Sequence, residues 1–196
     1  MLLVWLMFVL LVLYLLKITL FATGARRATT PAAHASRPSV SVILAARNEE
    51  AVIEQCLASL SALRYPGSME ILVVDDQSTD ATQDIMLRCA ERTPHMRVLR
   101  TEGSPHGLKG KANAIAQAIA QSNGEIILTT DADCVVPPDW VERTVEQYDE
   151  HTGSVCGFTL IKNNGAFSGM QAVDVAYLLT IASGGVCRGD PVGAVV

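Results

Sequence analysis

Along residues 40–161, short apolar stretches alternate with stretches that repeat apolar residues at helical intervals, and this alternation limits the folds open to the chain. The short stretches are rich in Val, Ile and Leu and too short for helices, which is typical of buried strands. The predicted strands are residues 40–45, 70–75, 97–100, 125–129 and 155–161, and Asn48 is predicted to cap the helix that follows the first strand. Strands that alternate with helices at this spacing predict an α/β domain with a mostly parallel sheet and helices on both faces.

The N-terminal stretch is more apolar than the rest of the chain. Between residues 2 and 22 only Lys17 and Thr19 interrupt a run of apolar side chains, and about 20 helical residues span a bilayer core. The sequence therefore predicts one transmembrane helix over residues 1–22 and a membrane location. No Lys or Arg precedes Lys17, which argues against a cleaved secretory signal, the alternative that would export the domain.

Positive charge follows the predicted helix. Three arginines lie between residues 26 and 37, and Lys17 can extend toward the same side, so the positive-inside rule predicts that the folded domain is cytoplasmic. Residues 23–39 are rich in Ala, Thr, Pro and Ser and are predicted to be a linker. The α/β domain would then occupy residues 40–196.

Charge and cysteine content argue against several classes of protein. The net charge is −5, and there is no basic patch with interleaved aromatic residues, so a nucleic-acid partner is not expected. The five cysteines are widely spaced and form no Cys-x-x-Cys pair. This pattern indicates a reducing compartment and argues against a disulfide framework or a structural zinc site.

Acidic residues follow three of the predicted strands. Glu49 comes after the first strand, Asp76 after the second, and Asp131 and Asp133 after the fourth. The carboxyl ends of parallel strands meet at one edge of the sheet, and ligands bind there where the strand order reverses. Acids gathered at that edge repel one another unless a cation or ligand offsets them, so their coincidence favours a binding site. Asp75 precedes Asp76 directly, so only one of the two can face that site.

The pair Asp131 and Asp133 has the spacing of a metal site. Side chains in an extended segment repeat with period two, so both carboxylates can face the same side. They would present hard oxygen ligands to Mg²⁺ or Mn²⁺, the ions that a diphosphate-containing substrate needs. The alternative is a solvated turn, because Asp is common after strands.

Two lysines mark a second feature of the predicted site. Lys109 and Lys111 lie at the start of a predicted helix, where the helix dipole disfavours positive charge, so an anion such as phosphate is expected to offset them. The alternative is that both are solvated in a loop. The sequence contains neither a Walker A loop at Lys111 nor a Gly-x-Gly-x-x-Gly motif after the first strand. A nucleotide would therefore be bound by carboxylates rather than by glycine turns.

Four segments resemble the family 2 glycosyltransferases of GT-A fold, in the order that the family shows. They are residues 40–50, 71–82, 107–114 and 130–133, with Ala-Arg-Asn-Glu-Glu, Val-Asp-Asp-Gln-Ser-Thr-Asp, Gly-Leu-Lys-Gly-Lys-Ala-Asn-Ala and Thr-Asp-Ala-Asp respectively. The predicted N-terminal helix makes the chain similar to the membrane-anchored branch of the family, which includes polysaccharide synthases and lipid glycosyltransferases.

The resemblance implies an inverting glycosyltransferase. Such an enzyme moves a sugar from a nucleotide-diphosphate donor, expected to be a UDP-sugar, to a lipid or polysaccharide acceptor at the cytoplasmic membrane face. The implied cofactor is Mn²⁺ or Mg²⁺, with Asp131 and Asp133 as metal ligands. The residues implied to bind the nucleotide are Ala46, Arg47, Asn48, Glu49, Asp76, Lys111 and Asp131. Of these, Asp76 would contact the base, and Asp131 the ribose or the metal.

The general base that takes the acceptor's proton comes from a later segment in this family, often Glu-Asp. The chain ends at Val196 before such a motif, so the base is expected beyond Val196 and the domain is expected to be incomplete at its C-terminus. Asp190 is the only acid among the last 20 residues, and it precedes the strand that normally leads to the base.

Two other functions remain open from the sequence. One is a phosphatase of the haloacid dehalogenase type, with Asp131 as nucleophile and Asp133 as acid/base. That motif belongs on the first strand of its domain, whereas this one follows the fourth predicted strand. The other is a non-catalytic, membrane-anchored fragment that binds nucleotide or a partner subunit.

Overall fold

The computed structural model describes residues 2–25, 37–104 and 107–148, and farther on residues 152–155, 157, 159–161, 165, 168–173 and 175. The chain divides into two compact units, Pro31–Val155 and Met1–Thr30 with Cys156–Val196. Most of the predicted linker over residues 23–39 lies outside the described residues, and so does Asp190.

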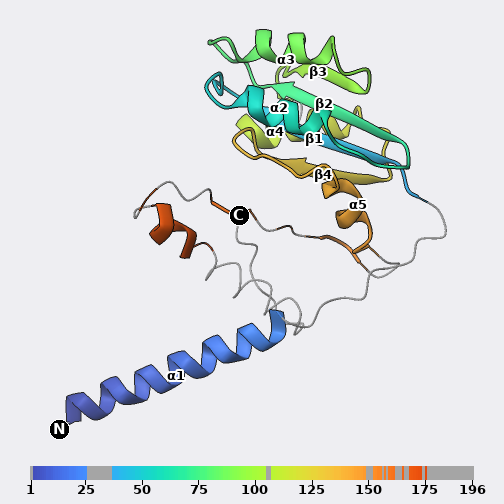
Figure 1. The fold of residues 1–196 in the computed structure, drawn as a ribbon. Helices are drawn as coiled ribbons and strands as arrows, with labels where there is room; N and C mark the ends of the chain where they lie inside the picture. Colours follow the sequence, from blue (N-terminus) through green and yellow to red (C-terminus); the bar gives the residue numbers. More distant parts are fainter. Residues whose placement is uncertain are drawn as a thin grey trace. The chain divides into compact units, whose positions relative to one another are not determined.

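The unit Pro31–Val155 is built on a four-stranded parallel sheet with the strand order β3-β2-β1-β4 (Figure 1). The strands are β1 (Val40–Ala46), β2 (Met69–Asp75), β3 (Met96–Arg100) and β4 (Ile126–Thr130). The helices are α2 (Ile53–Ser61), α3 (Thr82–Ala90), α4 (Gly110–Ile119) and α5 (Trp140–Val145). The α/β class and the parallel sheet predicted from the sequence are confirmed.

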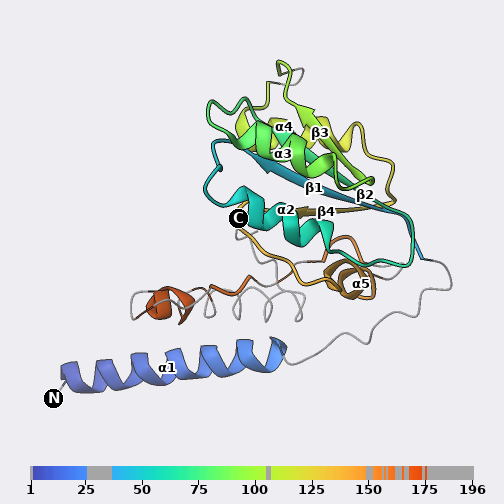
Figure 2. The same ribbon diagram turned by 45° about the horizontal axis from the view of Figure 1, so that its top comes forward.

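Helices cover both faces of this sheet (Figure 2). Leu57 of α2, Met86 of α3 and Val141 of α5 belong to the core on one face, whereas Ala114 and Ala118 of α4 belong to the core on the other. The chain moves in one direction from β1 to β3 and then returns to place β4 on the far side of β1. Because crossovers between parallel strands are right-handed, this return puts α4 on the opposite face from α2 and α3.

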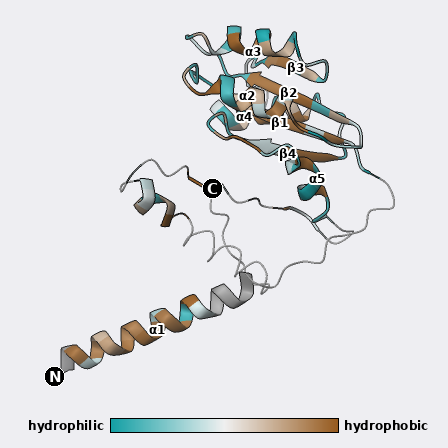
Figure 3. Ribbon diagram, in the orientation of Figure 1, coloured by the Kyte–Doolittle hydropathy of each residue, from teal (hydrophilic) through white to brown (hydrophobic). Residues whose placement is uncertain are grey.

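The central strand β1 shows why the sheet-forming sequences are almost continuously apolar. All seven of its residues are buried, because alternate side chains enter the two cores. Val42 and Leu44 pack with α2, and Ile43 and Ala45 pack on the side of α4. The hydrophobic colouring of β1 and β2 in Figure 3 follows from this double burial.

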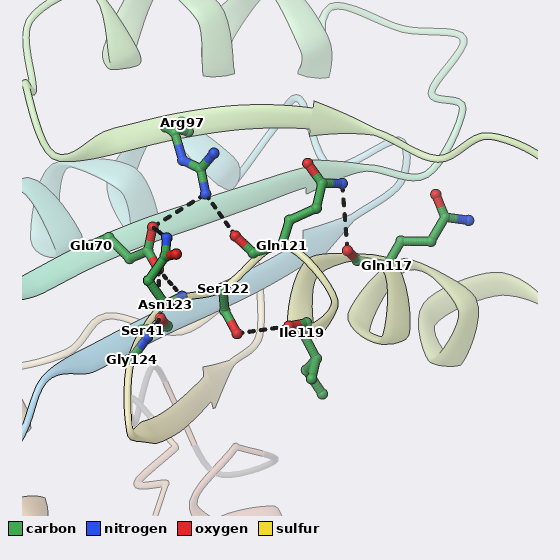
Figure 4. Close-up of polar contacts among 9 residues, drawn as sticks. All are labelled: Ser41, Glu70, Arg97, Gln117, Ile119, Gln121, Ser122, Asn123 and Gly124. Atoms are coloured by element: carbon green, nitrogen blue, oxygen red, sulfur yellow. Dashed lines mark hydrogen bonds and ion pairs between the residues drawn. The ribbon is translucent and has the colours of Figure 1, made fainter.

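A polar cluster around Glu70 fixes the start of the strand that leads to Asp131 (Figure 4). The buried Ser41 hydroxyl donates to Glu70 Oε1 at 2.7 Å and accepts the N–H of Gly124 at 2.8 Å. The backbone N–H of Asn123 donates to the same carboxylate oxygen at 2.6 Å, and Arg97 donates to the other at 3.2 Å. The loop between α4 and β4 is therefore tied to β1, β2 and β3.

Helix α1 (Leu2–Ala25) belongs to the other unit and is largely apolar in its sequence (Figure 3). Within the described residues, however, no helix is both long enough and apolar enough to cross a membrane. The prediction of a transmembrane helix over residues 1–22, and of a membrane location with a cytoplasmic domain, is wrong on this finding.

Two other predictions differ from the structure. No strand forms at residues 155, 157 and 159–161, the described part of the predicted fifth strand, and Leu160 there is 88% exposed rather than buried against a neighbouring strand. Helix α2 begins at Ile53, several residues later than a cap at Asn48 would give, because Asn48 adopts a left-handed φ of 55°. A residue in that conformation turns the chain instead of starting a helix.

Candidate functional site

A cleft of about 380 Å³ lies at the carboxyl ends of β1 and β4, on the edge where the strand order reverses. This is the topological switch point, the usual ligand-binding position in open α/β sheets. The lining residues come from the ends of β1, β2 and β4 and from the start of α4. They are Ala45, Ala46, Arg47, Glu49, Asp76, Gly110, Lys111, Asp131, Ala132 and Asp133.

The structure thus brings together all but one of the residues predicted to bind nucleotide or metal. Asn48 is the exception, because it does not line the cleft. Its Oδ1 accepts the N–H of Thr79 at 2.8 Å, and its own N–H donates to Ser78 Oγ at 3.0 Å. Asn48 therefore joins the loop after β1 to the loop after β2.

Three further hydrogen bonds join the same two loops at the residues that follow Asn48. The N–H of Glu50 donates to Asp80 Oδ2 at 3.2 Å, and the N–H of Ala81 donates to Glu50 Oε2 at 2.9 Å. The N–H of Glu49 donates to Thr82 Oγ1 at 2.8 Å. These reciprocal bonds hold the backbone of Glu49 and its neighbours at the edge of the cleft.

Asp75 and Asp76 occupy different environments, as the alternation of side chains requires. Asp75 is fully buried outside the cleft, where its Oδ1 accepts the N–H of Ser78 at 3.0 Å and its Oδ2 faces Arg100 Nε at 3.5 Å. Asp76 lines the cleft and is 8% exposed. Asp75 therefore supports the loop, and Asp76 is the carboxylate that a ligand can reach.

Lys111 and Asp131 form an ion pair and hydrogen bond between Nζ and Oδ1 within the cleft. Both side chains are about half exposed, at 54% and 57%. The pair explains how a positive charge is accommodated at the start of α4, because the carboxylate offsets it where the helix dipole does not. Lys109, the other lysine predicted here, is the N-cap residue of α4 and does not line the cleft.

The two aspartates after β4 fit a divalent ion that takes its other ligands from a substrate. Asp131 and Asp133 both line the cleft, but no group of three or more potential ligands occurs among the residues that the structure describes. Mg²⁺ and Mn²⁺ prefer oxygen ligands, and Mg²⁺ is usually bound by one or two carboxylates plus substrate phosphates and water. Asp131 and Asp133 would therefore hold such an ion, which would supply positive charge to a bound phosphate group.

Two thiols lie beside these aspartates. Cys56 Sγ donates to the backbone oxygen of Asp131 at 3.5 Å, and Cys134 Sγ lies 3.7 Å from Asp133 Oδ1. Burial, together with the neighbouring Cys134 and aspartates, raises the pKa of Cys56 to about 12. Burial and Asp133 also raise the pKa of Cys134. Both groups are therefore neutral thiols at physiological pH, and the cleft offers a metal ion carboxylates rather than thiolates.

Thr101 is a site residue that the sequence analysis missed. It is 4% exposed, its hydroxyl donates to Asp76 Oδ1 at 3.0 Å, and its N–H donates to the carbonyl oxygen of Asp75 at 3.0 Å. The signal lay in the strand register: Asp75 pairs with Arg100, so the next residue on each strand, Asp76 and Thr101, must be neighbours. The sequence alone does not give that register.

The fold and the cleft define an α/β domain with an acidic site at its topological switch point. The chain belongs to the family described as Glycosyl transferase family 2, which it matches over residues 41–181. The resemblance drawn from the four motifs is thereby confirmed, and the domain is that of a glycosyltransferase. The family match, together with the position of Asp131 after the fourth strand, argues against the phosphatase alternative.

Similarity to two curated proteins supports the assignment to this family. The chain is 38% identical over 116 residues to a beta-monoglucosyldiacylglycerol synthase of Synechocystis sp., a match that covers 59% of this chain and 24% of that protein. It is 30% identical over 143 residues to a poly-beta-1,6-N-acetyl-D-glucosamine synthase of Staphylococcus aureus, covering 71% of this chain and 33% of that protein. The chain thus spans about a quarter to a third of the length of these curated relatives.

A solved structure supports the same fold. A mannosyltransferase from Pyrobaculum calidifontis, in complex with GDP-Man and Mn²⁺, matches with a TM-score of 0.58 and 30% identity. The match covers 68% of this chain and 39% of that one. The chain therefore has a fold of the GT-A type in its sheet-containing unit.

Proposed function

We propose that this domain transfers a sugar from a nucleotide-diphosphate donor to a hydroxyl group of a lipid or glycan acceptor, with inversion at the sugar carbon. The observation that carries the proposal is the convergence of Asp76, Lys111, Asp131 and Asp133 in one cleft at the switch point. The named relatives support it, since one makes a glucosyl lipid and another a polysaccharide.

The cleft residues that the sequence predicted have proposed roles in holding the donor. Asp76 accepts an N–H of the base, and Ala46, Arg47 and Glu49 border the nucleoside. Lys111 places its positive charge where the diphosphate lies, near the start of α4. The negative charge that develops on the departing diphosphate is then stabilised by a group already in position.

Asp131 and Asp133 are the proposed ligands of Mn²⁺ or Mg²⁺. The Mn²⁺ in the mannosyltransferase complex supports a divalent ion in this type of site. When bound, such an ion supplies Lewis-acid stabilisation of the diphosphate leaving group. Asp131 also pairs with Lys111, so a bound ion and a diphosphate would together take over the contacts that these two side chains make with each other.

The inverting reaction also needs a base that accepts the proton of the acceptor hydroxyl. Asp76, Asp131 and Asp133 are assigned to the donor. The proposed base is therefore a carboxylate on a segment other than these strand ends.

The proposal is tested by incubating the protein with sugar nucleotides, Mn²⁺ and a panel of lipid and glycan acceptors. With a chain that includes the segment carrying the base, the expected result is release of a nucleoside diphosphate together with a glycoside of inverted anomeric configuration, measured by nuclear magnetic resonance. A product of retained configuration would contradict the proposed mechanism. Metal-dependent binding of the nucleotide without any product would instead favour the binding-only alternative.

A further inference from the structure

We infer that Cys56 and Ser59 of α2 are positioning residues for the proposed metal site, because they hold the two ends of the loop that follows β4. That loop carries Asp131 and Asp133. The inference rests on the proposed function, since it concerns the metal ligands of the proposed donor site. Neither Cys56 nor Ser59 lines the cleft, so both act through the backbone of the loop.

The thiol of Cys56 holds the first end of this loop. Its Sγ donates to the backbone oxygen of Asp131 at 3.5 Å, and the N–H of Cys134 donates to the same oxygen at 3.1 Å. The bond from Cys134 closes the turn that contains Asp131 and Asp133. A carbonyl oxygen can accept both bonds, and Cys56 is 1% exposed, so water does not compete for its thiol. Cys56 therefore ties this turn to α2.

The hydroxyl of Ser59 holds the other end of the loop. It accepts the N–H of Val136 at 3.2 Å and donates to the carbonyl oxygen of Cys56 at 2.7 Å. The hydroxyl thus connects the backbone of α2 with the backbone of the loop. Just beyond both segments, the N–H of Arg64 donates to the carbonyl oxygen of Pro138 at 2.8 Å. The loop is therefore attached to α2 and the residues after it at three points.

These attachments lie on the inner side of the loop, away from the cleft. Ala132 is 7% exposed and belongs to the core on the α2 side of the sheet, whereas Asp131 and Asp133 are exposed and line the cleft. Helix α2 is itself fixed in that core, because Leu57 and Leu60 are fully buried. The positions of the two carboxylates are therefore set relative to the core by α2.

A metal site with few protein ligands depends strongly on where those ligands lie. Among the residues that the structure describes, no third potential ligand joins Asp131 and Asp133, so no other side chain can compensate for a shift of the loop. Residues that orient metal ligands typically contribute about 10- to 100-fold to metal affinity. Asp76 and Lys111 follow β2 and begin α4, so a shift of the loop should leave them in place.

The experiment titrates the full chain with UDP by calorimetry at increasing concentrations of Mn²⁺. In Cys56→Ala and in Ser59→Ala, the Mn²⁺ concentration that gives half of the full increase in UDP affinity should rise about tenfold, the lower end of the range for residues that orient metal ligands. The UDP affinity without Mn²⁺ should stay unchanged. Cys56→Ser and Ser59→Thr keep a hydrogen-bonding group at each position and should restore most of the affinity for Mn²⁺.

Ser61→Ala is the matched control on the same helix, because the Ser61 hydroxyl donates to Leu57 at 2.9 Å and lies 2.9 Å from that of Thr93, away from the loop. An unchanged Mn²⁺ requirement in both alanine variants, or equal losses of UDP affinity with and without Mn²⁺, would overturn the inference and leave the proposed donor site intact. If Cys56→Ala does not fold, Ser59→Ala decides alone, since Ser59 is partly exposed. UDP binding that does not depend on Mn²⁺ in the unmodified chain would contradict the proposed metal site, and the inference with it.

Discussion

Lys111 is the residue whose role can be separated most cleanly from the rest of the cleft. Its ammonium group pairs with Asp131 at the start of α4, where a diphosphate is proposed to bind. The sequence predicted an anion at this position but did not show that a neighbouring carboxylate supplies it. That contact depends on the return of the chain from β3 to β4 beside β1, which follows from the topology rather than from the local sequence.

Replacement of this lysine should therefore affect phosphate binding selectively. Lys111→Ala should weaken the binding of UDP about tenfold or more, because a hydrogen bond to a charged group contributes roughly 1.5–3 kcal/mol. The binding of uridine should change little. Lys109→Ala is the matched control, since Lys109 is adjacent to α4 but outside the cleft. Equal losses for UDP and uridine would place Lys111 away from the phosphates.

Gly124 precedes β4, at the end of the sheet opposite the cleft, and provides a prediction about the stability of the fold. A Cβ at this position would lie 2.3 Å from the backbone nitrogen of Ser41 and 2.6 Å from the carbonyl carbon of Val40. Gly124→Ala should therefore destabilise the fold by roughly 1–3 kcal/mol, the usual cost of overpacking. Gly153→Ala is the control, because nothing lies within 4 Å of its Cβ position. Urea unfolding that gave both variants the same stability would contradict the close contact.

At the scale of elements, the strands were predicted more accurately than the loops that carry the site. Strands β1 to β4 lie within a residue or two of their predicted ranges, because burial on both faces leaves a continuous apolar signal in the sequence. The loop after β1 was predicted as a helix cap, yet the left-handed conformation of Asn48 and its bond to Thr79 make it a connection between loops. Such contacts depend on which loops become neighbours.

The Glu70 cluster makes the stability of the fold depend on pH. Burial alone would raise the pKa of Glu70, but hydrogen bonds from Asn123 and Ser41 and the charge of Arg97 outweigh it and lower the pKa below its usual value. A carboxylate with a lowered pKa in the folded state stabilises the fold above the unfolded pKa. That stabilisation is lost as the pH falls through the lower folded pKa.

The corresponding measurement compares the unmodified chain with Glu70→Gln in urea unfolding from neutral pH down to about pH 3, below the usual pKa of glutamate. The variant should be less stable at neutral pH by roughly 1–3 kcal/mol, because the donors around the carboxylate lose their charged acceptor. The difference should shrink toward acid pH. A difference that stayed constant over this range would show that the charge of Glu70 does not contribute.

For the whole molecule, the family could be inferred from four short motifs because each lies at the end of a strand or the start of a helix around one cleft. The N-terminal stretch was predicted less well. Its apolar composition indicated a transmembrane helix, but no helix in the described part of the chain meets the length and hydropathy that a membrane span requires.

The central claim is that the cleft binds a nucleoside diphosphate through a metal ion held by Asp131 and Asp133. The most direct measurement is calorimetric titration of UDP with and without Mn²⁺ into the unmodified chain, into Asp133→Asn, and into Asp84→Asn, an exposed aspartate on α3 that serves as the control. We predict that Mn²⁺ strengthens UDP binding in the unmodified chain and in the control but not in Asp133→Asn, with thermal unfolding unchanged in all three. The same Mn²⁺-dependent affinity in Asp133→Asn would contradict the claim.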